Sequence, residues 1–211
     1  SELVKTLFAK IKTYGIPCRK VPVEKLNSFT EKNHQGAVAF VAEISYSNIS
    51  DIIPTLYEAG KTPIIVALDG VTDIRNFGAI SRTCECAGVD AILLPSYCSA
   101  TINADAVKTS AGALHYLPVC RTDNLCQAIK FLKDSGFTII ALSEKANIAY
   151  TDQDYSSPTV LVLGAEGRGI SSEVLSLCDS TVKIPVLGKI ESLNVSVAAG
   201  IVIYEAVKSR Q

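Results

Sequence analysis

Four short apolar runs limit what this chain can fold into more than any other feature of its sequence. They are PIIVALD at 63–69, VDAILLP at 89–95, FTIIALS at 137–143 and TVLVLG at 159–164. A strand that is apolar at consecutive positions needs cover on both of its faces, which is typical of parallel sheets. Helical patterns separate the runs, so the sequence predicts an α/β fold in which helices cover both faces of a mostly parallel sheet.

The segments between these runs show helical periodicity. The clearest example is 124–135, where Leu125, Ala128, Ile129 and Leu132 share one face. Further predicted elements are a helix from near Asn76 to Gly88, helices around 104–113, from Ser171 and from about Ser192 to Lys208, and strands at 117–119 and 181–186.

The first part of the chain is organised differently. Apolar residues at helical spacing predict an amphipathic helix over 2–14, and AVAFVAE at 37–43 predicts a strand. We therefore expect a small α/β domain over 1–46. A linker with a weak helix follows at 47–62, and the main domain covers 63–211.

Composition and charge exclude several classes of protein. The chain is 48% hydrophobic and 19% charged, as ordinary globular proteins are. No apolar run approaches the roughly 18 residues of a membrane helix, and the start SELVKTLFAK lacks the order of a signal peptide, so we expect a cytoplasmic protein that does not contact membranes. With a net charge of −1, the protein is not expected to bind nucleic acid through overall electrostatic attraction alone. A local patch of basic residues is still compatible with this charge.

Seven cysteines lie mostly within apolar stretches, where they are expected to act as small hydrophobic residues. A thiol or zinc enzyme centred on Cys84 and Cys86 is disfavoured, because residues two apart on a helix point to different faces. Only His34 and His115 could add imidazole ligands. We therefore predict no metal site.

Three loops at the carboxyl ends of strands hold most of the unusual residues. They follow Leu68, Leu163 and Val186. In open parallel sheets, ligands bind outside the carboxyl ends of the strands. The functional site is therefore expected among these loops.

The first loop leads into a helix that opens at Asn76 and carries Arg82 away from its apolar stripe. Gly78 and Ala79 are small, so they leave room for a ligand to approach Arg82. Taken alone, Asn76 is also compatible with a plain helix cap and Arg82 with a solvated surface arginine.

The second loop, LVLGAEGRGIS, places Glu166 among Gly164, Gly167 and Gly169. Glycines permit positive φ and a close approach of ligand to backbone. The loop has neither the GxGxxG fingerprint of dinucleotide-binding proteins nor the Lys–Ser/Thr pair of a P-loop. Glu166 is either a solvent-facing turn residue or a carboxylate that holds a polar ligand or a cation.

The third loop places Ser192 and Asn194 at the start of the last helix. Unpaired N–H groups at that position invite capping, and they can also hold a negative group. The small residues that follow indicate that this helix packs closely against other backbone.

In order and spacing, the three loops resemble the three motifs of the SpoU/TrmH family of RNA 2′-O-methyltransferases, in the SPOUT superfamily. The family's Asn–Arg pair, six residues apart, matches Asn76 and Arg82. Its glycine–acidic–glycine turn matches 164–169, and its Ser-Leu-Asn signature matches 192–194. The resemblance covers 64–208. One departure is DIRN, where the family more often has a proline after the aspartate, and we expect it to alter the turn rather than the activity.

The resemblance implies a methyltransferase that uses S-adenosylmethionine and no metal. It implies transfer of a methyl group to a ribose 2′-hydroxyl in a structured RNA, either rRNA or tRNA. The catalytic residues would be Asn76, Arg82, Glu166, Ser192 and Asn194. The residues that bind the cofactor would be Leu163, Gly164, Gly169, Ile184 and Leu193.

The resemblance also implies a homodimer, a C-terminal trefoil knot (the SPOUT or α/β-knot fold) and an N-terminal L30e-like RNA-binding domain. Residues 1–46 are short for a complete copy of that domain, so it is either reduced or lacks its first strand and helix. Two alternatives stay open at this stage. One is a non-catalytic RNA-binding protein that retains the methyltransferase fold, and the other is an ordinary nucleotide-binding α/β enzyme.

Overall fold

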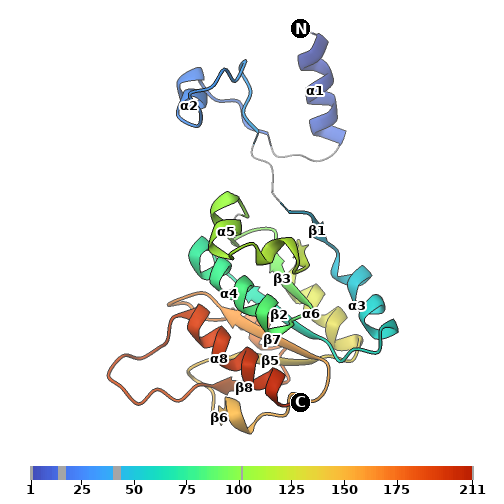
Figure 1. Ribbon diagram of the computed structural model, residues 1–211, viewed down its shortest axis with the longest axis vertical. Coiled ribbons are helices and arrows are strands. Elements are labelled where there is room, and N and C mark those ends of the chain that lie inside the picture. The colour runs from blue at the N-terminus through green and yellow to red at the C-terminus, as the bar shows by residue number, and fades with distance from the viewer. Residues whose placement is uncertain (1, 14–17, 40–43, 101, 211) are drawn as a thin grey trace. The chain divides into compact units, whose positions relative to one another are not determined.

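The computed structural model describes residues 2–13, 18–39, 44–100 and 102–210. The chain divides into two compact units, Ser1–Val41 and Ala42–Gln211. Both are drawn in Figure 1.

The first unit contains two helices, α1 (Glu2–Thr13) and α2 (Val23–Asn27). The ammonium group of Lys25 lies 5.1 Å from the centre of the Phe29 ring. The helix expected over 2–14 is confirmed as far as Thr13, because Tyr14 lies outside the described residues. The strand expected over 37–43 is absent at 37–39, and the rest of that segment lies outside the described residues.

The second unit is built on an eight-stranded sheet in the order β1-β4-β3-β2-β7-β5-β8-β6, in which every strand pair is parallel. The strands are β1 (Tyr46–Ser47), β2 (Ile64–Asp69), β3 (Ala91–Pro95), β4 (Val119–Thr122), β5 (Thr138–Leu142), β6 (Ile148–Ala149), β7 (Thr159–Gly164) and β8 (Ser180–Lys183). The predicted parallel sheet is confirmed, and β2 and β7 lie at its centre.

Helices cover both faces of the sheet, as predicted (Figure 1). One face carries α4 (Ile74–Ala87), α5 (Ala104–Thr109), the short 3-10 helix η1 (Ala113–His115) and α8 (Val195–Lys208). The other face carries α3 (Ile49–Glu58), α6 (Leu125–Asp134) and α7 (Ser172–Leu175). A further 3-10 helix, η2 (Tyr150–Asp152), follows β6.

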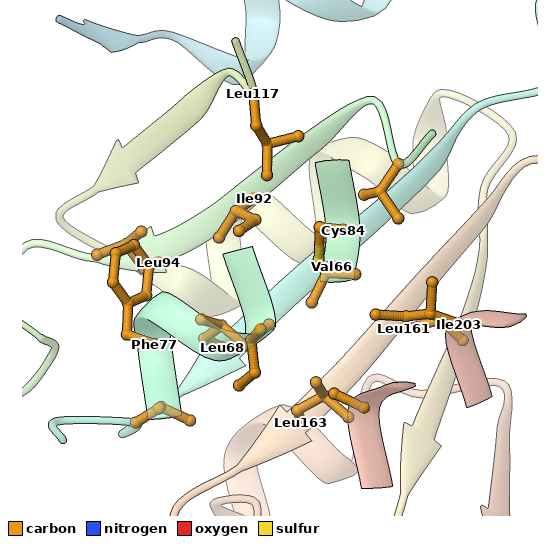
Figure 2. Packing of buried hydrophobic residues seen from close by; sticks show 14 of the residues in the cluster. Val66, Leu68, Phe77, Cys84, Ile92, Leu94, Leu117, Leu161, Leu163 and Ile203 are labelled. Carbon is orange, nitrogen blue, oxygen red and sulfur yellow. The ribbon is translucent and has the colours of Figure 1, made fainter. Parts of the chain in front are cut away.

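Alternate residues of the central strands supply the two halves of the core. Val66 and Leu68 of β2 pack with Phe77 of α4 and Ile203 of α8, as Figure 2 shows. Their neighbours Ile65 and Ala67 belong to the cluster on the opposite face. Because consecutive side chains of a strand point to opposite faces, a continuous apolar run is what a doubly covered strand requires.

The stretch expected as a linker, 47–62, is part of the second unit. It contains the ten-residue helix α3, capped by the Asn48 side chain, which accepts from the Ser50 amide. Ile49 and Ile53, one turn apart, are buried against the sheet. The weak helix expected within this stretch is present, and the burial of this apolar pair stabilises it.

After α8, the side chain of Arg210 joins the end of the chain to two loops. Its Nε donates to the Tyr155 carbonyl at 2.8 Å, and Nη2 donates to the Ser157 carbonyl at 2.6 Å. Nη1 donates to the carbonyl of Thr62. Arg210 therefore holds the C-terminal end of the chain against the beginnings of β2 and β7.

Replacing Arg210 with alanine should destabilise the second unit by about 2 kcal/mol, because several partly buried acceptors lose a charged donor. Thermal and urea denaturation would measure the loss. Lys208→Ala is a matched control, since Lys208 is exposed and its amine pairs, among the described residues, with Glu205 of its own helix alone. Equal stability of the two variants would contradict this role for Arg210.

Candidate functional site

Helix α4 begins at Ile74, two residues earlier than the sequence suggested. The Asp73 carboxylate caps it and accepts from the amides of Arg75 and Asn76 at 2.8 and 2.9 Å. The prediction that Asn76 opens the helix is therefore wrong, because Asp73 already satisfies the free N–H groups. The Asn76 side chain, within the first turn, is left available for a contact outside α4.

The loop after β7 is a tight turn closed by two hydrogen bonds between Ala165 and Gly169, at 3.2 and 2.8 Å. Gly167 and Gly169 have φ of +79° and +72°, as the predicted use of glycine requires. Gly164 serves a different purpose. A Cβ placed there would lie 2.2 Å from the Gly169 carbonyl carbon, so no side chain fits.

Asp69, at the end of β2, fixes the far end of this turn. Its carboxylate is 9% exposed, and Oδ2 accepts from the Ser171 amide at 2.7 Å. Asp69 was not among the predicted site residues. The sequence does show an aspartate directly at the end of an apolar strand. A carboxylate that is buried at such a position needs a hydrogen-bond donor, which indicates a structural contact.

Asn194 brings three distant segments together. As the cap of α8, its Oδ1 accepts from the Ser196 amide at 2.9 Å. Its Nδ2 donates to Asn76 Oδ1 at 3.0 Å and to Glu166 Oε1 at 2.6 Å. The side chains of Asn76, Glu166 and Asn194, from the three loops singled out in the sequence, therefore form one hydrogen-bonded group.

Beside this group lies a cavity of about 510 Å³, which we call the strand-tip cavity. Its walls are the end of β5, the turn after β7, the segment 184–194 and the first turn of α8. A cavity of this volume is large enough for a small organic ligand. The lining includes all five predicted cofactor residues and three of the five predicted catalytic ones, namely Leu163, Gly164, Gly169, Ile184, Leu193, Glu166, Ser192 and Asn194.

Arg82 does not join this group. It is exposed on the outward face of α4, together with Arg75 and Cys86, and is not part of the cavity lining. Six residues beyond Asn76, it lies about 9 Å further along the helix axis. Within the described part of the chain it has no hydrogen bond or ion pair.

The expectation that Gly78 leaves room for a ligand is wrong. Gly78 is buried, and a Cβ there would lie 2.6 Å from Cβ of Thr109 in α5. The glycine therefore allows α4 and α5 to pack closely and does not open a path to Arg82.

Four of the seven cysteines, Cys84, Cys120, Cys126 and Cys178, are buried or half-buried as expected, whereas Cys18, Cys86 and Cys98 are exposed. Burial raises the pKa of the Cys84 thiol, and raises that of Cys120 to about 12. Both thiols are therefore protonated near neutral pH, and a thiolate is the form that attacks or binds metal. Across the described residues, no group of three or more His, Cys, Asp or Glu side chains is arranged to hold a metal ion.

Comparison with known families agrees with this geometry. Residues 63–204 match the model of the SpoU rRNA Methylase family. The chain belongs to this family. Residues 1–47 match a second model, described as RNA 2′-O ribose methyltransferase substrate binding. The resemblance seen in the three loops is thereby confirmed at the level of the SpoU family.

Relatives in the SpoU family extend over most of the chain. A putative TrmH family tRNA/rRNA methyltransferase of Bacillus subtilis, YacO, is 34% identical over 94% of this chain and 80% of its own length. An uncharacterized tRNA/rRNA methyltransferase of Mycobacterium marinum is 38% identical over 93% of this chain and 64% of its own length.

Solved structures of SpoU methyltransferases share the fold. AviRb from Streptomyces viridochromogenes, in complex with the cofactor AdoMet, superposes with a TM-score of 0.71 at 26% identity, over 79% of this chain and 66% of that one. An AdoMet-bound rRNA methyltransferase from Sinorhizobium meliloti gives 0.71 at 30% identity, over 78% and 61%. The chain thus spans less than two thirds of the length of these two solved proteins.

No helix in the described part of the protein is both long and apolar enough to cross a membrane.

Replacing Gly164 with alanine should open the turn after β7 and destabilise the second unit by about 1–3 kcal/mol, the usual cost of overpacking. Thermal denaturation gives the stability, and hydrogen exchange at 165–170 reports on the turn itself. Gly188→Ala is the matched control, because a Cβ there meets no atom within 4 Å. Unchanged exchange in Gly164→Ala would show that the turn tolerates a side chain.

Proposed function

We propose that the protein transfers a methyl group from S-adenosylmethionine to a ribose 2′-hydroxyl of rRNA or tRNA. The observation that carries the proposal is the hydrogen-bonded group of Asn76, Glu166 and Asn194 at the mouth of the strand-tip cavity. Membership of the SpoU family supports it, as does the match of 1–47 to a 2′-O ribose methyltransferase substrate-binding model.

The residues of the strand-tip cavity fit such a donor. Leu163, Ile184 and Leu193 give apolar surface for an adenine ring, and the backbone at Gly169, where a Cβ would meet no atom within 4 Å, is open to close approach. When bound, the donor supplies a methyl group already activated by a sulfonium, so the chemistry needs no metal. The protein's task is then to orient the two reactants and to help remove the hydroxyl proton.

Asn194 contributes to this orientation by fixing the positions of Asn76 and Glu166, because its Nδ2 group donates to both side chains. Ser192 lies two residues before it in the cavity wall, where its hydroxyl can contact the acceptor ribose. Asn76, Glu166 and Asn194 act by positioning, because the hydrogen bonds between them fix their side chains before any ligand binds.

Arg82 is proposed to bind an RNA phosphate and to stabilise the oxyanion that develops on the ribose. A guanidinium is a poor general base, since it keeps its proton in proteins, so the phosphate or water accepts the proton. Because Arg82 lies on the outward face of α4, this role requires an RNA that reaches from the cavity to that face. A second subunit that presents its own arginine to the cavity would meet the same requirement.

The direct test is methyl transfer to RNA from cells that lack the gene, with the modified ribose mapped by its resistance to alkaline hydrolysis. Arg82→Ala should lower turnover about 100-fold or more and leave the dissociation constant of S-adenosylmethionine unchanged. Arg75→Ala, from the same exposed face of α4, is the matched control and should keep most of the activity.

Three results would contradict parts of this proposal. Near wild-type turnover of Arg82→Ala would remove the role of the arginine. Methylation of a base would remove the ribose assignment. A wild-type protein that binds RNA and gives no heat with S-adenosylmethionine would be a non-catalytic RNA-binding protein.

We further propose a homodimer, formed through the outward face of α8. This helix is apolar on nearly all sides, and such helices are normally buried. Val197 and Tyr204 are nevertheless each 52% exposed in the single chain. A second copy that covers this face would complete their burial.

Tyr204→Glu should convert the dimer to a monomer, because a carboxylate in an apolar interface loses its hydration without gaining a partner. Light scattering after size-exclusion chromatography measures the mass. Tyr116→Glu is the matched control, since Tyr116 is 80% exposed and lies at the end of η1, away from α8 in the sequence. A dimer in both variants would place the interface elsewhere.

The trefoil knot and the L30e-like nature of the first unit are also proposals. The knot is supported by the position of β7 between β2 and β5, and by the long segment 184–194, which leaves β8 and returns to α8 (Figure 1). An RNA-binding role for the first unit is supported by the match of 1–47. A substrate of rRNA or tRNA is consistent with a cytoplasmic location.

A further inference from the structure

The strand-tip cavity is lined by charges of one sign. Three carboxylates face it, from Glu144 after β5, Glu166 in the turn after β7, and Glu191 before α8. No lysine, arginine or histidine is among its lining residues, all of which lie in the described part of the chain. Lys145, Arg168 and Lys189 are neighbours in sequence, but none of them lines the cavity.

The three carboxylates differ in how they are used. Glu166 accepts from Asn194 Nδ2 and belongs to the hydrogen-bonded group already described. Glu144 and Glu191 are exposed, and the described residues give them no hydrogen bond or ion pair. No internal contact among the described residues explains these two charges, and both residues line the cavity, so an occupant of the cavity would experience their field.

We propose that Glu144 and Glu191 make the cavity select the cationic methyl donor over its uncharged product. This inference rests on the proposed function. S-adenosylmethionine carries a sulfonium, an ammonium and a carboxylate, and has a net charge of +1. Transfer breaks its methyl C–S bond, forms a C–O bond at the ribose and leaves the electron pair on sulfur, while the hydroxyl proton departs to phosphate or water. The remaining S-adenosylhomocysteine is a thioether with no net charge.

Charge is the main property by which the cavity can distinguish these two ligands. Adenine, ribose and the amino acid group are the same in both, so apolar and backbone contacts contribute alike to the binding of each. The two ligands differ by one positive charge on the sulfur atom. A nearby carboxylate therefore attracts the donor more strongly than the product. The cavity is therefore expected to bind the donor more tightly than the product. After each reaction, this difference favours the replacement of the product by a new donor molecule.

The expected size of the effect follows from Coulomb's law. A carboxylate roughly 7 Å from the sulfonium, in surroundings close to water, favours the donor about threefold in dissociation constant. Both carboxylates together should give about tenfold if their effects multiply. Salt should weaken the preference, because screening acts over about 10 Å at 0.1 M ionic strength.

The test is calorimetric titration of the full-length protein with S-adenosylmethionine and, separately, with S-adenosylhomocysteine, at low and at high salt. Glu144→Gln and Glu191→Gln keep the shape of each side chain and remove its charge. Each should weaken donor binding about threefold at low salt and leave product binding unchanged. An analogue with an amine in place of the sulfonium methyl should behave as the donor does. Glu173→Gln is the control, because Glu173 is exposed on α7 and does not line the cavity.

The possible outcomes are distinct. A larger loss for the donor than for the product, reduced by salt, supports the inference. Equal losses for both ligands would show that the two residues shape the cavity and do not select charge, which overturns it. No change in either dissociation constant also overturns it. Failure of the wild-type protein to bind either ligand would instead refute the proposed function, and this inference with it.

Discussion

The pairing of β2 with β7 is the contact on which the rest of the site depends. The two strands run side by side in register from Ile64 opposite Thr159 to Asp69 opposite Gly164. They are far apart in sequence, yet their ends bring the start of α4 next to the turn after β7. The Asp69 carboxylate strengthens this link, because it accepts from Ser171 at the end of that turn. A shift of one residue in this register would reverse the face of every side chain on β7.

Asn194 couples the stability of α8 to the geometry of the site. An asparagine side chain has one oxygen that accepts and one nitrogen that donates. The oxygen is used at the start of α8, where it accepts from the amide and the hydroxyl of Ser196. The nitrogen must then point to acceptors, and Asn76 and Glu166 supply them. An aspartate could cap the helix equally well, but it would face the Glu166 carboxylate without a proton to donate.

Sequence patterns were sufficient for the layers of the fold and for much of the site. Continuous apolar runs gave the parallel strands, and the single apolar face of 124–135 gave α6. The patterns could not give the place of β7 between β2 and β5, because strand order follows from non-local packing. They also misplaced the start of α4, since two capping residues, Asp73 and Asn76, lie within one turn. The convergence of the three loops was expected from their places at the carboxyl ends of strands, and the family resemblance singled out Asn76, Glu166 and Asn194 within them.

A chain with a net charge of −1 that handles both a cationic donor and a polyanionic RNA must keep its charges apart. The strand-tip cavity has carboxylates and no basic residue in its lining, whereas Arg82, which is proposed to bind an RNA phosphate, projects from the outward face of α4. An RNA phosphate brought to the cavity would meet repulsion from Glu144 and Glu191, so the backbone of the RNA is favoured to run along α4 instead. In the proposed reaction, only the ribose hydroxyl, which is neutral, then needs to approach the donor. The separation of Arg82 from the cavity is therefore compatible with two distinct binding surfaces. The outward face of α4 would bind the phosphates, and the strand-tip cavity would bind the cationic donor.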